Sequence, residues 1–412
     1  MSRMDELEVV VHGRQRQVDS LVWSDDDNNG SSSGSSTAEE GRFGVLYEPV
    51  RLAQGVGIPG AQWTGVVTGI ACSMLDTGQV DAVVCIAAAE DSNESSWSSP
   101  EPILARTVQE VLRGRGVKPA LAPSLRVLDE IQQDDSVKRL LFCGVGCAVQ
   151  AFRAVQDQLQ LEQVYVLGTN CADNSPTPEA AERFLREGVR VADKKIRGYE
   201  FMQDFNVHVK TDNAYITRPY FSLPGTIAEP SIAKSCLACF DYTNALADIS
   251  VGYMGAPLVS GARMDESYQT LTVRNERGAQ MVQTAVKAGR LRLGKVAVGQ
   301  GKHESLAAAT VQSDTIVMAM TGRPVPESGM PVWMGKILAF VISNVGPKGI
   351  NFARYSIDYH ILRNYLHVVD EWGEERASNG MPRYAKDIVD HYIRSDPKFG
   401  KLCSEVAAAL HS

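Results

Sequence analysis

The chain has 412 residues, 44% of them hydrophobic, and a formal net charge of −8, which indicates a globular protein of about two domains. The negative charge argues against a general nucleic-acid binder, because no basic excess is present to neutralise phosphates. No apolar run is long enough to span a bilayer, and the eight irregularly spaced cysteines do not resemble a secreted disulfide framework, so a reducing compartment is favoured.

The first third of the chain combines a low-complexity stretch with an α/β pattern. Residues 24–41 are acidic, rich in serine and without large apolar side chains, which predicts a disordered loop within an N-terminal segment 1–43. Beyond it we expect helices at 62–75, 103–112 and 124–133 and a buried strand at 80–87. Residues 55–60 match G-x-G-x-x-G, but 49–54 make a poor strand, which disfavours a dinucleotide-binding Rossmann site.

The predicted helix at 62–75 begins with residues that suit a cofactor. Small side chains on one of its faces would let a flat ring or a phosphate approach the backbone, near Gln62, Trp63, Thr64 and Thr68. Close packing against another helix explains the small residues equally well.

Four cysteines in the middle of the chain form its most informative pattern. Cys147 lies between a predicted strand at 138–142 and a helix at 148–159, and Cys171 follows a second predicted strand at 163–167. Two parallel strands would bring both cysteines to one edge of a sheet, and Cys236 and Cys239 add a Cys-x-x-Cys. Four thiolates suit a 4Fe–4S cluster or a structural zinc ion. Only one Cys-x-x-Cys is present, which favours the cluster, while unrelated buried thiols are the remaining alternative.

The second half changes from strands to helices. A hairpin is expected from 206–210 and 214–220, strands at 249–253 and 270–274, and helices at 279–288, 333–343, 352–369 and 383–393. Arg274, Asn275 and Arg277 lie where a strand gives way to a helix, which suits a clamp for phosphate or carboxylate as well as ordinary ion pairing. The fold class is therefore a mixture of α/β and α+β, with βαβ units first, a β-rich middle and a helical C-terminal extension.

Long motifs then connect the chain to a known family. It resembles the beta-subunit family of the deazaflavin-reducing hydrogenases in residues 144–150 (GVGCAVQ), 168–171 (GTNC), 236–252 (CLACFDYTNALADISVG) and 272–278 (TVRNERG). Residues 199–205 (YEFMQDF), 219–224 (PYFSLP) and 346–356 (GPKGINFARYS) are similar to its plastid and cyanobacterial branch. The resemblance covers nearly the whole chain outside residues 24–41 and 290–325.

The resemblance implies a domain order and a set of cofactors. Residues 44–135 would form the family's N-terminal domain with the helix start that contacts FAD, 136–300 the catalytic domain with the cluster cysteines, and 301–412 a linker and helical extension. It implies one FAD near Gln62, Trp63, Thr64, Thr68, Arg274, Asn275 and Arg277, and a 4Fe–4S cluster on Cys147, Cys171, Cys236 and Cys239. A second cluster would need cysteines upstream of Met1, so we expect the sequence to begin downstream of the true N-terminus. Cys143 is expected near the site without being a ligand.

The resemblance also implies an activity, a partner and a location. The implied reaction is the ferredoxin-dependent reduction of 7-hydroxymethyl chlorophyll a to chlorophyll a in the chloroplast, although the sequence itself contains no transit peptide. Reduction of 3,8-divinyl chlorophyllide and a non-catalytic pigment-binding role are the alternatives, and a homo-oligomer is compatible with each. Asp241 and Asp248 are positional candidates for a proton donor, but capping or backbone contacts explain them better. For ferredoxin docking, the densest basic segments are 113–118 and 194–197.

Overall fold

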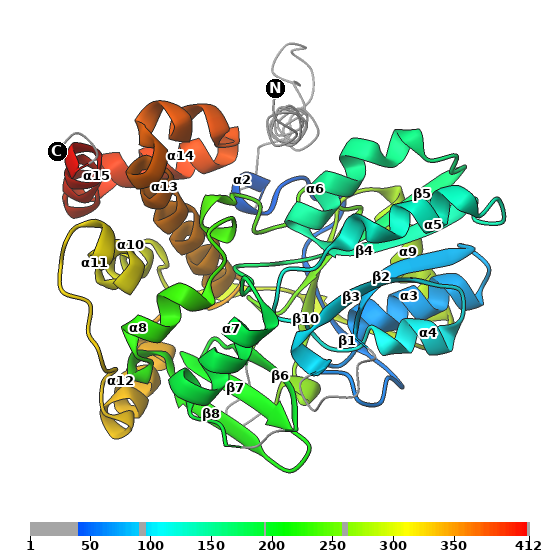
Figure 1. The fold of residues 1–412 in the computed structure, drawn as a ribbon, viewed down its shortest axis with the longest axis horizontal. Helices are drawn as coiled ribbons and strands as arrows, with labels where there is room; N and C mark the ends of the chain where they lie inside the picture. Colours follow the sequence, from blue (N-terminus) through cyan, green and yellow to red (C-terminus); the bar gives the residue numbers. More distant parts are fainter. Residues whose placement is uncertain (1–39, 90–95, 193–194, 258–262, 410–412) are drawn as a thin grey trace.

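A mixed sheet organises the part of the chain that this computed structural model describes, namely residues 40–89, 96–192, 195–257 and 263–409 (Figure 1). Within these residues the sheet has eight strands in the order β11-β1-β10-β9-β5-β4-β2-β3. The strands are β1 (Arg51–Gly55), β2 (Ala82–Ala88), β3 (Pro100–Ala105), β4 (Arg139–Val145), β5 (Gln163–Thr169), β9 (Ile249–Gly252), β10 (Gln269–Val273) and β11 (Leu291–Val296). The central strands β2, β4, β5 and β9 are parallel, and all other pairings are antiparallel. The carboxyl ends of the central strands therefore meet at one edge.

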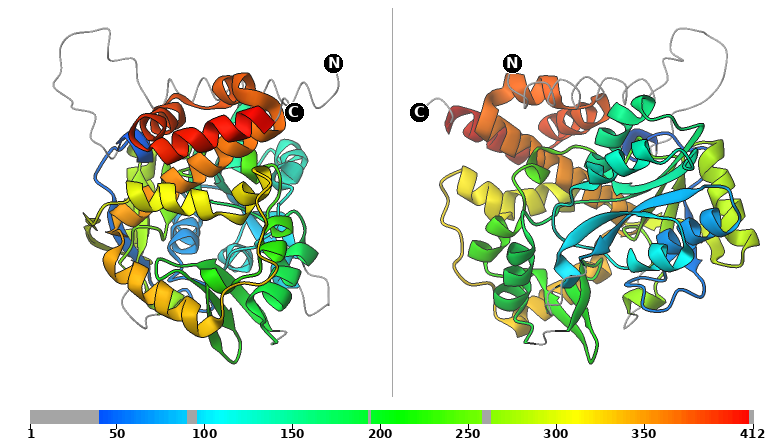
Figure 2. Two further views of the ribbon diagram at one scale, coloured as in Figure 1. Left: turned by 90° about the vertical axis from the view of Figure 1, so that its left-hand side faces the viewer. Right: turned by 45° about the vertical axis from the view of Figure 1, so that its right-hand side comes forward.

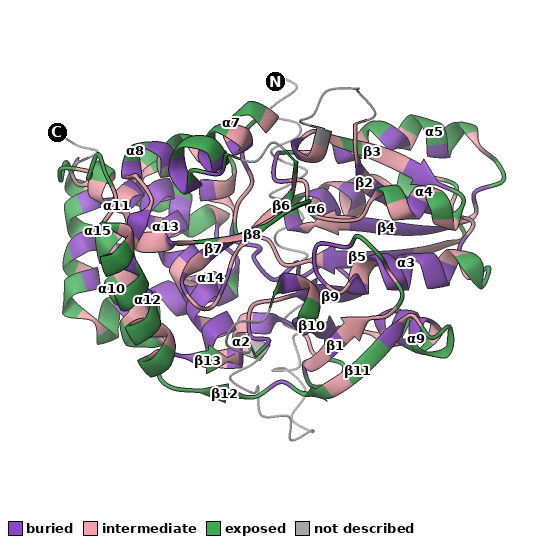
Figure 3. Cartoon of the chain, turned by 90° about the horizontal axis from the view of Figure 1, so that it is seen from below, coloured by how far each residue is buried: buried purple, intermediate pink, exposed green. Residues whose placement is uncertain are grey.

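Helices cover both faces of this sheet because successive strand residues point to opposite sides. Leu141 of β4 packs in the layer with α3 (Val66–Asp76), α4 (Val108–Arg113) and α9 (Glu276–Lys287). Its neighbour Phe142 packs on the other face with α6 (Gly146–Val155) and α5 (Leu128–Gln133), and stacks on Phe152 with the ring centroids 4.2 Å apart. Figure 3 shows the continuous buried layer that results.

The rest of the described chain forms a small sheet and a helical region beside the large sheet (Figures 1 and 2). The small sheet consists of β6 (Ile196–Phe201), β7 (Asn206–Thr211) and β8 (Tyr215–Pro219), and α7 (Pro178–Arg183) and α8 (Gly225–Ala228) lie next to it. The helical region holds α10 (Glu304–Ser313), α11 (Thr315–Met320), α12 (Val332–Val345), α13 (Ile350–Gly380), α14 (Arg383–Ser395) and α15 (Pro397–Ala409), with the short pair β12 (Gly299–Gln300) and β13 (Lys348–Gly349). Within the described ranges, no helix is both long and apolar enough to cross a membrane.

The structure confirms the predicted mixture of fold types and corrects several elements. The helix expected at 103–112 is wrong in its first part. Residues 100–105 form β3, an edge strand where prolines are tolerated, and the helix starts only after Thr107, which forms a capping box with Glu110. The poor strand at 49–54 overlaps a real one, β1, because pairing with β10 and β11 on both sides compensates for its weak pattern. Both pairings are antiparallel, so β1 does not build a Rossmann unit.

The structure also describes the end of the predicted N-terminal segment and most of the predicted domains and linker. Residues 24–39 of the predicted disordered loop lie outside the described residues, and 40–41 begin α2 (Glu40–Phe43). The predicted domains 44–135 and 136–300 contribute strands to the same large sheet. Much of the linker expected from residue 301 is helical, since α10 and α11 lie there.

A buried carboxylate joins three helices of the described chain and gives a first prediction. The Asp358 carboxylate on α13 accepts two hydrogen bonds from Arg42 on α2, at 2.8 and 3.0 Å, and one from Tyr392 on α14 at 2.7 Å. Burial by itself would raise the pKa of Asp358, but His303 and Arg42 outweigh it and hold this pKa below its usual range. We expect Asp358→Asn to lower the free energy of unfolding by about 2 kcal/mol at pH 7, in urea titrations.

The pH dependence of this effect follows from the direction of the shift. A lowered pKa in the folded state stabilises the protein above the unfolded value of about 3.9, and this stabilisation is lost as the pH falls through the folded value. The difference in free energy of unfolding between the wild type and Asp358→Asn should therefore become smaller below about pH 4. Glu405→Gln, at an exposed pair with Lys401, is the control and should change stability little.

Candidate functional site

A cavity of about 1440 Å³ opens where the carboxyl ends of β2, β4, β5 and β9 meet the small sheet and α13. Ile86, Val145, Thr169 and Gly252 line it from the large sheet, and aromatic side chains such as Tyr355 line it from α13. This edge is the usual place for a ligand in an α/β protein, and the volume exceeds the ~300–1,000 Å³ of a pocket for one drug-sized ligand.

Two of the four predicted cluster cysteines line this cavity. Cys147 is the second residue of α6 and is exposed, and Cys171 follows the end of β5. Cys236 opens the 3-10 turn η8 (Cys236–Ala238), and Cys239 ends it. Because β4 and β5 are parallel, Val145 lies opposite Thr169, which brings the first two cysteines to the same edge as predicted. Of the other thiols, Cys85 on β2 and Cys143 on β4 are buried and also line the cavity, and Cys72 and Cys403 are buried elsewhere.

The pKa of each predicted ligand thiol depends on burial and on the groups around it. Burial raises the pKa of Cys171, and Cys147, Cys236 and Cys239 raise it further. Cys147 is exposed at the cavity, but the protein atoms around it still raise its pKa by excluding water, and the backbone N–H groups at the start of α6 act in the opposite direction. A bound metal would remove these protons, because the thiolate is the ligand form.

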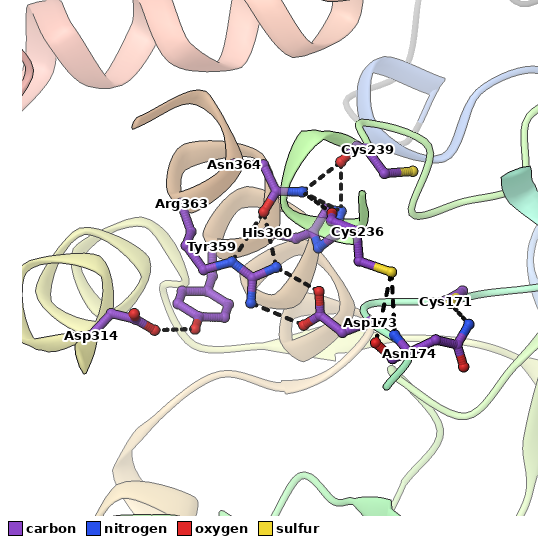
Figure 4. A network of polar contacts seen from close by, with 10 residues as sticks. All are labelled: Cys171, Asp173, Asn174, Cys236, Cys239, Asp314, Tyr359, His360, Arg363 and Asn364. Atoms are coloured by element: carbon purple, nitrogen blue, oxygen red, sulfur yellow. Dashed lines mark hydrogen bonds and ion pairs between the residues drawn. The ribbon is translucent and has the colours of Figure 1, made fainter. Parts of the chain in front are cut away.

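Helix α13 holds the Cys-x-x-Cys turn in place (Figure 4). The Asn364 side chain donates to the carbonyl oxygens of Cys236 at 2.9 Å and of Cys239 at 2.6 Å. His360 Nε2 lies 3.0 Å from the same Cys239 oxygen, and burial lowers the pKa of His360 to about 4. The turn is thus anchored through its backbone, which leaves the two thiols free to bind a ligand.

An ion pair between the buried Arg363 and the half-buried Asp173 connects the same helix to the Cys171 loop. Arg363 donates to both carboxylate oxygens of Asp173, at 2.9 and 2.8 Å, and its other N–H groups donate to Asn364 Oδ1. Next to Asp173, Asn174 directs its backbone N–H at Cys236 Sγ, 3.4 Å away, and its side-chain amide at Cys171 Sγ, 3.6 Å away (Figure 4). N–H groups aimed at sulfur are what an iron–sulfur cluster accepts from its surroundings.

Four thiols are the ligand set of a cluster or of a single ion. Among the described residues, no group of three His, Cys, Asp or Glu side chains is close enough to hold one metal ion. A single zinc ion needs its sulfur ligands at about 2.3 Å, whereas a 4Fe–4S cluster spreads four thiolates around a cube of several atoms. A cluster on these four cysteines stays a prediction.

The residues predicted to contact FAD separate into two groups. Gln62, Trp63 and Thr68 are buried and line the cavity, while Thr64 is next to them and accepts a hydrogen bond from the Gly55 N–H. Helix α3 follows Gly65, which is in the left-handed conformation and has no side chain to cap the helix, while the Val66 N–H donates to Gln269 Oε1 at 3.4 Å. The remaining N–H groups of a helix start at a cavity wall suit a phosphate group.

Arg274, Asn275 and Arg277 do not line the cavity. Asn275 and Arg277 donate to Asp248, which also accepts from Arg153 and from the Val166 backbone N–H. Arg274 is buried and donates to the carbonyl oxygens of Phe43, Val45 and Thr243. These three residues hold the chain together, so the FAD role predicted for them receives no support from the geometry.

The two candidate proton donors are likewise occupied by structural contacts. Asp248 is surrounded by the donors just described, and Asp241 accepts from the Ala245 N–H at 2.8 Å and from Gln150 at 2.9 Å. Burial raises the pKa of Asp241. Neither side chain lines the cavity, which agrees with the capping alternative.

The predicted ferredoxin-docking segments present fewer free charges than their sequences suggest. Lys118 is directed inward, lines the cavity and donates to the carbonyl oxygens of Arg115 and Gly116, and burial lowers its pKa to about 8. In the other segment Arg197 pairs with Asp212, and Lys194 lies outside the described residues. Docking at either segment stays a prediction.

Sequence reasoning missed Glu200, which lines the cavity from β6. It also missed Asp173, Arg363 and Asn364, which support the cysteine loops. The one sequence signal for Glu200 was its place in the YEFMQDF motif. The sequence could not reveal its hydrogen-bond partners, because they come from distant segments.

Comparisons with known proteins identify relatives of this chain. Residues 51–129 match the family described as coenzyme F420 hydrogenase/dehydrogenase, beta subunit N-term, and residues 137–298 match its C terminus. The chain is 44% identical over 393 residues to 7-hydroxymethyl chlorophyll a reductase, chloroplastic, of Oryza sativa subsp. japonica, covering 95% of this chain and 77% of the relative. It is 37% identical to an uncharacterised Nostoc protein, covering 95% of this chain and 87% of that one.

A solved structure shares the fold. It is a chain of the F420-reducing NiFe hydrogenase complex of Methanosarcina barkeri, with a TM-score of 0.52 and 21% identity over 61% of this chain and 83% of that one. The matched family segments together with the long, similar plant relative establish that this chain belongs to the coenzyme F420 hydrogenase/dehydrogenase beta-subunit family, a family of oxidoreductases.

Proposed function

We propose that this chain is a ferredoxin-dependent iron–sulfur flavoprotein of the chloroplast that reduces 7-hydroxymethyl chlorophyll a to chlorophyll a. The observation that carries the proposal is that Cys147 and Cys171 line a large cavity at the carboxyl edge of the parallel strands, while Asn174 contacts the sulfur atoms of both Cys171 and Cys236 of the Cys-x-x-Cys. The plant relative, named a chloroplastic reductase of this pigment, supplies the choice of substrate.

The cofactor assignment follows from the chemistry of these residues. Cys147, Cys171, Cys236 and Cys239 would hold a 4Fe–4S cluster, and Gln62, Trp63, Thr68 and the start of α3 would hold FAD. When bound, the cluster passes single electrons and the flavin supplies them as a hydride pair, which matches a one-electron donor to a two-electron reduction.

The protein itself would orient the pigment and exclude water. Apolar and aromatic side chains such as Phe205, Tyr220 and Tyr355 line the cavity opposite the cysteine edge and suit the flat face of a tetrapyrrole. Replacing the hydroxyl of the substrate by hydrogen consumes two electrons and two protons and releases water. A side chain near the departing oxygen must therefore supply a proton.

The test is turnover with purified components. With reduced ferredoxin and 7-hydroxymethyl chlorophyll a, we expect chlorophyll a to form with two ferredoxins oxidised per product, measured by chromatography and absorbance. The Cys171→Ala variant should show no turnover. Reduction of 3,8-divinyl chlorophyllide instead would establish the alternative substrate, and the absence of product from both pigments would favour a pigment-binding role.

A further inference from the structure

Glu200 is the one acidic side chain of β6, and the structure surrounds it in an unusual way. It is half-buried, and it lines the cavity. Gln62 Nε2 donates to Glu200 Oε1 at 2.9 Å, and Trp63 Nε1 lies 3.5 Å from the same oxygen. Tyr253, which stacks on Trp63 with the ring centroids 4.7 Å apart, adds a hydrogen bond through its hydroxyl. Three segments that are distant in the sequence thus fix the position of this carboxyl group.

The surroundings of Glu200 contain hydrogen-bond donors but no compensating cation. Among the described residues, no Lys, Arg or His side chain forms an ion pair or hydrogen bond with Glu200. The titratable groups that face it are four tyrosines, Tyr199, Tyr220, Tyr242 and Tyr253, each with its pKa raised by burial and further by Glu200. A carboxyl group of this kind keeps its proton more readily than one at the surface.

Different elements position Glu200 and the cysteines. Glu200 belongs to the small sheet and contacts Gln62 and Trp63, which precede α3, whereas the thiols lie around α6, the end of β5 and η8. A substrate bound in the cavity between them would face the predicted cluster cysteines on one side and Glu200 on another.

We propose that Glu200 donates the proton that allows the hydroxyl group of the substrate to leave as water, an inference that rests on the proposed function. The carbon–oxygen bond of the hydroxymethyl group breaks and a carbon–hydrogen bond forms. The electron pair comes from two reduced ferredoxin molecules. The Glu200 proton joins the departing oxygen to form water, and the carboxylate regains a proton from solvent before the next turnover.

The protonation state of Glu200 suits this role. Burial raises the pKa of Glu200 to about 7, against the hydrogen bonds from Trp63, Tyr253 and Gln62, which favour the carboxylate. The protonated form of Glu200 is therefore abundant below about pH 7 and is lost above it. The turnover rate should accordingly decrease as the pH rises above about 7. Replacing Tyr253 by Phe removes one of the bonds that favour the carboxylate and should move this fall to higher pH.

The experiment compares Glu200→Gln with a matched control, Glu182→Gln. Glu182 is another half-buried glutamate; it accepts from Ser98 and does not line the cavity. We expect kcat with 7-hydroxymethyl chlorophyll a to fall about 100-fold or more in Glu200→Gln and to stay near wild type in Glu182→Gln. FAD content and the rate of flavin reduction by ferredoxin should be unchanged in both.

The protonation state of Glu200 can also be measured directly, without substrate, by infrared spectroscopy. Difference infrared spectra between about pH 5 and about pH 9 should show a protonated carboxyl band that titrates near pH 7, is missing in Glu200→Gln and moves to higher pH in Tyr253→Phe. Loss of FAD from Glu200→Gln, or kcat above about a tenth of wild type, overturns the donor role while the function stands. If the wild-type protein does not reduce the hydroxymethyl pigment, the proposed function fails and the donor role fails with it, whatever the infrared band shows.

Discussion

Cys171→Ala should lose its iron, from about four atoms per chain to nearly none, and with it all ferredoxin-driven turnover. Cys171 is the thiol whose pKa is raised by all three of the other predicted ligands. Removing one of four thiolates leaves one iron of the cube without its ligand, and the other two cysteines that line the cavity, Cys85 and Cys143, are buried in the core. Iron and acid-labile sulfide are measured on anaerobically purified protein.

The matched control is Cys143→Ala, which removes the same sulfur atom a few residues from Cys147. Cys143 packs in the core with Leu141 and Leu167, so its loss should cost about 1 kcal/mol of stability and leave the iron content unchanged. Iron lost from Cys143→Ala and retained in Cys171→Ala would show that the ligand set is different from the one proposed.

Arg363→Met should destabilise the protein by about 3–5 kcal/mol and weaken the hold on the cluster at the same time. The Arg363 side chain is only 3% exposed, and its removal leaves the half-buried Asp173 carboxylate without its partner and Asn364 without its orienting donors. Asp173 positions the loop after Cys171, and Asn364 anchors the carbonyls of Cys236 and Cys239. Both the Cys171 loop and the Cys-x-x-Cys turn should therefore be held less firmly. Urea unfolding measures the loss of stability, and the rate of iron release to a chelator measures the weaker hold on the cluster.

Two variants make this result specific. Arg186→Met removes an arginine that is 69% exposed and pairs with Glu187, so stability should change by less than about 0.5 kcal/mol. Combining Arg363→Met with Asp173→Leu removes the stranded charge and should recover part of the stability without restoring slow iron release. Full recovery of both quantities would mean that the ion pair does not position the cysteines.

The cysteine site was predictable because its placement depends on local patterns. Cys147 follows a run of buried strand residues and opens an amphipathic helix, and Cys171 ends the next strand, so parallel pairing was enough to place both at one edge. The contacts of α13 were not predictable in this way. Arg363 reaches a carboxylate 190 positions earlier in the sequence, and nothing in the helical pattern of 352–369 distinguishes it from a surface arginine.

The same distinction explains why three of the predicted FAD residues do not line the cavity and why Glu200 was missed. Arg274, Asn275 and Arg277 stand where a strand gives way to a helix, which often marks an anion site, but the buried Asp248 supplies the anion from within the chain. Glu200 is one acidic residue of an ordinary strand until the fold brings Gln62, Trp63 and Tyr253 around it. The apolar spacing at 103–112 predicted a helix, but residues 100–105 form a strand because they pair with β2.

The most direct test of the central claim is metal and flavin analysis of the 412-residue chain after anaerobic purification, with an absorption spectrum. We predict about four irons and four sulfides per chain, one FAD, and a broad shoulder near roughly 400 nm beside the flavin bands. Stoichiometric zinc without flavin would contradict the account and leave the four cysteines as the ligands of a structural ion.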